Sequence, residues 1–156
     1  MKLAVGSDER THVTAAVIAE LEKRGHTVEL FGPLRDGKEL WPQVAQAVAE
    51  RVAGGQADEG ILFCWTGAGV TIAANKVPGV RAALCQDAET ARGARRWNRA
   101  NVLCLSLRAT SEVIAQEILD AWFATPLGTE PVDVECVAAV SEIEIKYARQ
   151  GDTVAR

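Results

Sequence analysis

A cysteine followed by a run of small residues is the feature of this sequence best suited to chemistry. Cys64 ends the apolar stretch at residues 60–64 and is followed by Trp65, Thr66 and the small residues GAG at positions 67–69. A thiol near the positive end of a helix ionises more easily than a free one, so Cys64 could act as a nucleophile or as a base. Backbone amides of the small residues could hold an oxyanion beside it.

Other interpretations of the same stretch have to be weighed. The glycines could serve a tight turn only, or the G-x-G spacing of Gly67 and Gly69 could begin a dinucleotide site. Ile72 stands where such a site needs a third small residue, which argues against the nucleotide. Acyl transfer by a cysteine normally needs a histidine partner, and the only candidates are His12 and His26. Proton abstraction beside a carbonyl needs no histidine, and the sequence favours it.

The segments around this stretch alternate between short apolar runs and amphipathic runs. The pattern predicts strands at residues 2–6, 27–31, 60–64, 81–85 and 101–107, and helices at 12–25, 41–55, 70–76, 88–97, 111–125 and 132–148. Such an alternation is typical of a three-layer α/β/α sandwich around a five-stranded, parallel, Rossmann-like sheet. We expect residues 1–150 to form a single domain and residues 151–156 to be a flexible C-terminal tail.

The order of the predicted elements also indicates where a ligand should bind. In open parallel sheets, ligands lie beyond the carboxyl ends of the strands, where helix N-termini point their amides. Polar residues that follow the predicted strands should therefore gather at one edge of the sheet: Asp8, Thr66, Gln86, Asp87 and Arg108. Cys64 ends a strand at the same edge, so the thiol lies where function is expected.

The composition is that of an ordinary globular protein and narrows its partners. The chain has 156 residues, 48% of them apolar, and a formal net charge of −4, which gives no reason to expect nucleic acid as a partner. No apolar run reaches the ~18 residues of a membrane span, and no stretch has the pattern of a signal peptide. The four cysteines lack a C-x-x-C pair, so a metal site is not expected. We expect a cytoplasmic protein.

Several blocks of the sequence resemble a known enzyme family. GILFCWTGAGVTIAANKVPGVRAALCQD across residues 60–87, GSD at residues 6–8 and NRANVL at residues 98–103 are similar to the family of ribose-5-phosphate isomerase B and galactose-6-phosphate isomerase. The resemblance spans roughly residues 1 to 125. It implies an α/β/α sandwich and a homodimer with active sites between the subunits, with a tetramer as the alternative assembly. It also implies aldose–ketose isomerisation of a sugar or sugar phosphate through a cis-enediol, without metal or organic cofactor.

The resemblance implies a role for each matching position. Cys64 corresponds to the base that moves a proton between C1 and C2, and Thr66 to the residue that supports proton transfer on the sugar oxygens. Asp8 corresponds to the acid that contacts the sugar hydroxyls. The other matching positions are Gly67, Ala68 and Gly69 in the backbone cradle, Asn98 supplied across the dimer, and Arg108 at the phosphate. Val70 stands where some relatives have a glutamate base, which leaves Cys64 as the candidate.

Other positions depart from the family pattern. Glu9, Gln86 and Trp97 stand where the family has histidines, of which the last is credited with opening the furanose ring. Trp41 replaces a tyrosine, and Trp65 replaces a glycine after the thiol. The C-terminal arginines that clamp phosphate are not evident in the acidic segment 130–147. We therefore expect the pocket to be lined by Glu9, Arg10, Trp41, Trp65 and Trp97, with Arg10 replacing part of the lost positive charge.

These departures favour an isomerase that keeps the enediol machinery but uses a substrate other than ribose 5-phosphate. A short or open-chain sugar phosphate such as a tetrose phosphate, or an unphosphorylated sugar, would fit. The alternatives are a non-catalytic protein that binds a sugar or metabolite, and a Cys64-based epimerase or lyase on a related carbonyl compound. We expect Cys85, Cys104 and Cys136 to be core residues, and Trp122 to lie in the core or at a dimer contact.

Overall fold

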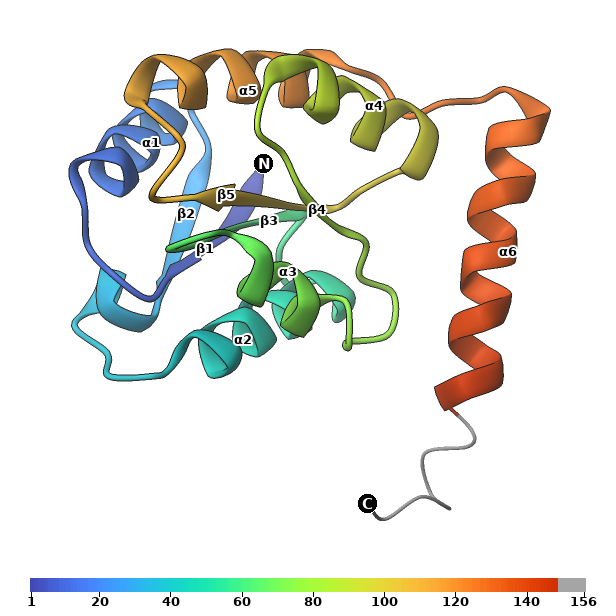
Figure 1. Cartoon of the computed structure of the whole chain (residues 1–156), viewed down its shortest axis with the longest axis horizontal. Coiled ribbons are helices and arrows are strands. Elements are labelled where there is room, and N and C mark those ends of the chain that lie inside the picture. Colours follow the sequence, from blue (N-terminus) through green and yellow to red (C-terminus); the bar gives the residue numbers. More distant parts are fainter. Residues whose placement is uncertain (149–156) are drawn as a thin grey trace.

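A parallel sheet between two layers of helices forms the body of the protein. The computed structural model describes residues 1–148 (Figure 1). Its strands are β1 (Lys2–Ser7), β2 (Thr27–Phe31), β3 (Glu59–Cys64), β4 (Ala82–Leu84) and β5 (Val102–Ser106). The five strands pair in the order β2-β1-β3-β5-β4, and every pairing is parallel. The predicted α/β/α sandwich with a five-stranded Rossmann-like sheet is confirmed, while the predicted tail at 151–156 lies outside the described residues.

The helices cover the two faces of the sheet in two separate layers. One layer holds α1 (His12–Lys23), α4 (Ala88–Asn98) and α5 (Glu112–Ala124), and the other holds α2 (Trp41–Ala53) and α3 (Ala68–Ala74) (Figure 1). A short 3-10 helix, η1 (Gly32–Arg35), follows β2 and was not predicted. The last helix, α6 (Pro131–Ala148), projects away from both layers.

The central strand β3 shows why the sheet is buried on both sides. All of its residues are buried, and they alternate between the two cores. Ile61 and Phe63 pack with α1, α4 and α5, whereas Leu62 and Cys64 pack with α2 and α3. Because side chains along a strand point alternately to opposite faces, this alternation turns the Cys64 side chain toward the α2–α3 layer.

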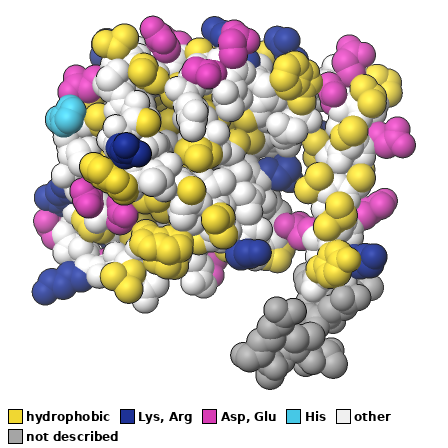
Figure 2. Space-filling model, viewed as in Figure 1, with side chains coloured by type: hydrophobic (Ala, Val, Ile, Leu, Met, Phe, Trp, Pro, Cys, Tyr) yellow, Lys and Arg dark blue, Asp and Glu magenta, His cyan; other side chains and the backbone are white. Residues whose placement is uncertain are grey.

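Helix α6 differs from the others because it buries little of its surface in this chain. Figure 2 shows hydrophobic side chains along its length, and Val140, Ile143 and Tyr147 are all more than half exposed. Its Cys136 is exposed as well, so the predicted core position of this residue is wrong for the single chain. Trp122, by contrast, is fully buried, as predicted. No helix among residues 1–148 is both long and apolar enough to span a membrane.

Candidate active site

The thiol of Cys64 opens into a cavity at the carboxyl edge of the sheet. Cys64 is the last residue of β3, and only 5% of it is exposed. The cavity has a volume of about 330 Å³ and is lined by Asp8, Trp41, Cys64, Trp65, Thr66 and Gly69. Ligand pockets in proteins span about 300–1,000 Å³, so this cavity is large enough for a small sugar phosphate. The structure thus brings residues from three separate strand-to-helix crossovers to one cavity.

The turn after Cys64 is anchored to the end of β5. Gly67 has a left-handed φ of +75°, and its amide donates a hydrogen bond of 3.1 Å to the Cys64 carbonyl. A Cβ at this position would lie 3.1 Å from the carbonyl carbon of Leu105, so both the conformation and the space require glycine. The Trp65 carbonyl accepts bonds from the Arg108 amide at 3.0 Å and the Ser106 hydroxyl at 2.9 Å. These bonds fix the backbone that carries the thiol.

Trp65 forms a wall of the cavity without closing it. Although Trp65 stands where the family has a glycine, the residue is 58% exposed and leaves the space beside Cys64 open. Trp41 forms another wall, because a Cβ on Gly69 would lie 3.2 Å from the Trp41 ring. The glycine therefore allows the indole to lie directly against the first turn of α3. An apolar cavity with a few polar groups is the usual form of a small-molecule site.

The first turn of α3 supplies backbone amides close to the thiol. The helix begins at Ala68, two residues before the predicted start at residue 70. The first amides of a helix have no carbonyl partner within it, so those of Ala68 and Gly69 can bind the oxygen of a ligand. The Ala68 amide is 3.4 Å from the Thr66 hydroxyl, a long contact that a ligand can displace. The Gly67 amide is committed to the Cys64 carbonyl, so the predicted cradle is reduced to Ala68 and Gly69.

Asp8 brings a carboxyl group with unusual properties to the same cavity. One of its oxygens, Oδ1, is buried and has no hydrogen-bond partner among the described residues. Partial burial and the neighbouring charge of Glu9 raise the pKa of Asp8 above its usual value. The Ser7 hydroxyl holds the loop in place, since it donates to the Glu9 carbonyl at 2.6 Å and accepts from the Glu9 amide at 3.2 Å. Asp8 is therefore positioned to exchange hydrogen bonds with a bound hydroxyl.

Glu9 and Arg10 do not line the cavity. Glu9 is exposed, and the Arg10 side chain turns toward the loop after β2. There Arg10 donates from Nε to the Pro33 carbonyl at 2.6 Å and from Nη2 to the Leu34 carbonyl at 2.9 Å. Arg10 Nη2 also forms an ion pair with Asp36 Oδ1 at 3.0 Å. The placement does not support the prediction that Arg10 supplies positive charge to the substrate.

A second cavity adjoins the first through Thr66. It has a volume of about 410 Å³ and is lined by Thr66, Gln86, Ser106, Arg108 and Ala109. Arg108 is exposed and forms no ion pair with any other described residue. Sequence reasoning placed Gln86 and Arg108 at this edge but missed Ser106. Ser106 could have been found as a polar residue near the end of the apolar run at residues 101–107.

Trp97 and Asn98 lie apart from the thiol in the single chain. Trp97 is 55% exposed and lines a cavity of about 250 Å³ with the segment after α5. Its ring packs over Gly93, where a Cβ would come within 2.8 Å of the indole. Asn98 lines a cleft of about 530 Å³ between the body and α6. Both residues were predicted to bind substrate, and neither lines the cavities that contain Cys64 and Arg108.

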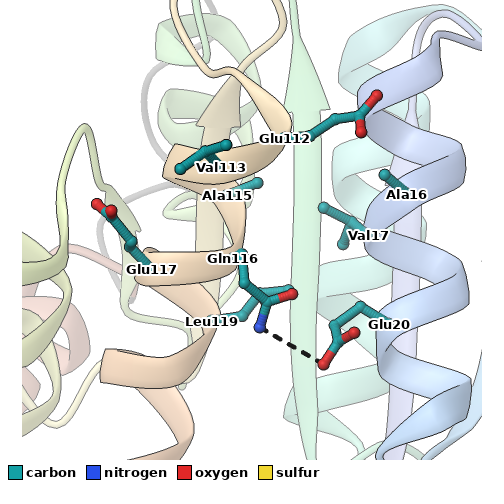
Figure 3. A pocket seen from close by; sticks show the side chains of 9 residues that line it. All are labelled: Ala16, Val17, Glu20, Glu112, Val113, Ala115, Gln116, Glu117 and Leu119. Atoms are coloured by element: carbon teal, nitrogen blue, oxygen red, sulfur yellow. Dashed lines mark hydrogen bonds between the residues drawn. The ribbon is translucent and has the colours of Figure 1, made fainter.

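The groove between α1 and α5 is a different kind of cavity. It has a volume of about 420 Å³, with an apolar floor and carboxylates from Glu20, Glu112 and Glu117 (Figure 3). Gln116 donates to Glu20 across it at 3.4 Å. It contains no thiol and no histidine.

Burial raises the pKa of Cys85 and Cys104 to about 12, so neither of these thiols ionises at neutral pH. Cys64 remains the thiol placed for chemistry.

Comparison with known proteins points to one family. The model of the Ribose/Galactose Isomerase family matches residues 3–138. Ribose-5-phosphate isomerase B of Escherichia coli is 35% identical over 144 residues, which cover 90% of this chain and 97% of that protein. D-erythrulose-4-phosphate isomerase of Pectobacterium atrosepticum is 36% identical over 124 residues, with 78% and 82% covered. The solved structure of Clostridium thermocellum ribose-5-phosphate isomerase B has a TM-score of 0.87 and 39% identity, and the match covers 94% of this chain and 99% of that one.

Proposed function

This chain belongs to the ribose/galactose isomerase family and is a sugar-phosphate isomerase, and we propose that it interconverts an aldose and a ketose phosphate with Cys64 as the base. The observation that carries the proposal is the position of this thiol. Cys64 ends the central strand and lines a cavity that Asp8 and Thr66 also line. A base, an acid and a hydroxyl at one small cavity are the groups that a proton transfer along a sugar needs.

The reaction moves one proton between neighbouring carbons. The Cys64 thiolate takes the proton from C2 of the aldose, and the C–H electrons form the C1=C2 double bond of a cis-enediolate. The negative charge on O1 is stabilised by the amides of Ala68 and Gly69, which point at developing charge without having to reorganise. The Thr66 hydroxyl carries a proton from O2 to O1. The thiol then returns its proton to C1, which gives the ketose and regenerates the thiolate.

The substrate that best fits these residues is a tetrose 4-phosphate and its ketose isomer. A tetrose closes a furanose ring through its C4 hydroxyl, and a phosphate on that oxygen keeps the sugar open. An open-chain sugar needs no acid to open a ring, and no histidine lines the cavities that contain Cys64 and Arg108. His26 packs against Phe123, with ring centroids 4.8 Å apart. The similarity to D-erythrulose-4-phosphate isomerase supports this substrate class.

The two adjoining cavities suit a short phosphorylated chain. C1 and C2 would lie beside Cys64, and the phosphate would extend past Thr66 to Arg108. A guanidinium binds phosphate oxygens through parallel hydrogen bonds, which makes it the preferred group for this contact. Arg108 has no competing carboxylate within the described part of the chain, so its charge is available to the ligand.

A second copy of the chain would complete the site. Trp97 and Asn98 lie away from Cys64, and α6 presents apolar side chains to solvent in the single chain. A homodimer would cover this apolar surface and bring the end of α4 to the partner's cavity. We propose the homodimer as the active form, which agrees with the roles that the resemblance implies for these two residues.

Isotope exchange tests the proposal directly. The protein is incubated in deuterated water with erythrose 4-phosphate and, separately, with ribose 5-phosphate. We expect deuterium at C1 or C2 with erythrose 4-phosphate and much slower labelling with ribose 5-phosphate. The Cys64→Ala variant should be labelled about 10²–10⁴-fold more slowly, whereas Cys136→Ala, which removes an exposed thiol of α6, should behave as the wild type.

Other outcomes would identify the rival functions. Binding without any exchange would indicate a non-catalytic sugar-binding protein. Exchange at a carbon other than C1 or C2, or cleavage of the carbon chain, would indicate an epimerase or a lyase. Equal rates with both sugars would refute the preference for an open-chain substrate but not the isomerase itself.

A further inference from the structure

Two crossover loops lead to residues that line the Cys64 cavity. The loop from β1 to α1 carries Asp8, and the loop from β2 to α2 leads through η1 to Trp41. The loops touch at Gly32, which has a left-handed φ of +64° and where a Cβ would lie 2.8 Å from the Ser7 carbonyl oxygen. Asp8 and Trp41 both line the cavity, so its shape depends on how these loops are held together.

The Arg10 side chain is the polar link between the two loops. Its guanidinium donates to the carbonyls of Pro33 and Leu34 and lies beside Asp36, the residue that ends η1. These carbonyls belong to the C-terminal turn of η1, whose negative end attracts a cation. The Pro33 carbonyl also accepts from the Asp36 amide at 3.1 Å, so Arg10 adds a second bond to it. The planar guanidinium reaches two adjacent carbonyls at once, which a lysine ammonium cannot do with fixed geometry. Arg10 therefore fixes both the distance and the orientation between the loops.

The link continues from Arg10 to the reacting groups. Arg10 is two residues after Asp8, and the Ser7 hydroxyl holds the backbone between them. On the other side, the loop beyond Leu34 leads to Trp41, whose ring packs against Gly69 in the first turn of α3. If the two loops separated, Asp8 would shift on one side of the cavity. On the other side, Trp41 and the amides of the first turn of α3 would shift.

We propose that Arg10 is a positioning residue, which latches the loop that carries Asp8 to the loop that leads to Trp41 and so sets the geometry of the cavity. The inference rests on the proposed function of that cavity. It also means that the Arg10 guanidinium is not available to a ligand, because it already contacts the carbonyls of Pro33 and Leu34 and the carboxylate of Asp36. Among the described residues that line the two cavities, Arg108 is then the cation that meets the phosphate.

The test compares Arg10→Met with Arg35→Met. Arg35 is a matched control, since it belongs to the same loop and pairs with an acid of that loop, Glu39, but joins nothing to Asp8. Four quantities are measured: kcat and KM for erythrose 4-phosphate, the inhibition constant of inorganic phosphate, and hydrogen exchange of the amides of residues 33–40. Small displacements of catalytic groups cost up to about 10²-fold in rate, so we expect kcat to fall roughly tenfold in Arg10→Met.

The same variant should exchange the amides of residues 33–40 faster, while the inhibition constant of phosphate stays within about twofold of the wild type, because no phosphate contact is lost. Arg35→Met should leave kcat, KM and the inhibition constant of phosphate unchanged, because its partner Glu39 belongs to the same loop and the pair joins nothing to Asp8. A higher inhibition constant with unchanged kcat and unchanged exchange would show that Arg10 binds phosphate, and would overturn the latch. Unchanged values throughout would overturn it as well.

The latch and the proposed function fail in different ways. Absence of isomerase activity in the wild type would refute the function, whereas the exchange of residues 33–40 would still report whether Arg10 holds the loop. A fully active wild type with no effect of Arg10→Met would leave the function standing and remove the latch.

Discussion

The Cys64 turn and the α4–α6 end of the molecule are built in opposite ways. The turn follows a fully buried strand, and backbone bonds of about 3 Å tie it to the end of β5. At the other end, Trp97 and Asn98 face open cavities, and α6 leaves much of its apolar surface exposed. The contrast teaches that one chain holds the proposed reacting groups in place by itself, whereas Trp97 and Asn98 would reach the site only in the proposed homodimer.

The largest effect is expected at the centre of the rigid region. Cys64→Ala removes the proposed base, and general-base catalysis contributes about 10²–10⁴-fold, so kcat should fall by that factor. The free energy of unfolding should change little, because the thiol is a small group at the edge of the core. Steady-state kinetics and a urea titration measure the two quantities. Retained activity would show that another group removes the proton.

The next prediction concerns the buried ion pair that connects the end of α4 to β3. Glu59, at the start of β3, accepts from Arg95 Nη2 and from Trp122 Nε1, both at 2.6 Å. Breaking a buried ion pair leaves an unpaired charge and costs about 3–5 kcal/mol, so Arg95→Met should lower the free energy of unfolding by that amount. Arg92→Met, on the exposed side of the same helix, serves as the control in the same urea titration. Equal losses in both variants would contradict a special role for the buried pair.

A substitution on α6 tests the dependence on a neighbour. Ile143 is 59% exposed, and surface substitutions usually change stability by less than about 0.5 kcal/mol, so Ile143→Glu should leave the single chain folded. If a second copy covers this helix, the variant should be monomeric by analytical ultracentrifugation and lose activity. Glu142→Ala, an exposed neighbour, should remain dimeric. A monomeric wild type with full activity would remove the contrast between the two regions.

The smallest effect is expected from the carboxyl group of Asp8. Its pKa is raised in the folded protein from an ordinary value of 3.8, so the folded state binds the proton more tightly than the unfolded state. Stability from this group is present at low pH and is lost as the pH rises through the folded pKa. Asp8→Asn should therefore be slightly more stable than the wild type at neutral pH, and the difference should shrink in acid. Thermal unfolding at several pH values measures this difference in stability. The same variant should also have a lower kcat.

Local patterns in the sequence predicted the elements well because their causes are local. Apolar runs such as residues 60–64 form buried strands, and periodic runs such as 111–125 form helices wherever they pack. The start of α3 was placed two residues late, since Gly67 as its N-cap depends on a tight fit against Leu105 of another strand. The short helix η1 was missed for a related reason, because its end is capped by Arg10 from a distant loop.

The sequence by itself determined the layered fold and the edge of the sheet at which Asp8, Cys64 and Thr66 line one cavity. These follow from strand order and from the rule that parallel strands end at the same side. Only the tertiary structure decided that Arg10 bonds to Pro33 and Leu34, that Cys136 is exposed, and that Trp97 and Asn98 lie away from the thiol. Residue type and spacing define which face a side chain occupies, but its partner is chosen by the distant segment that packing brings against it.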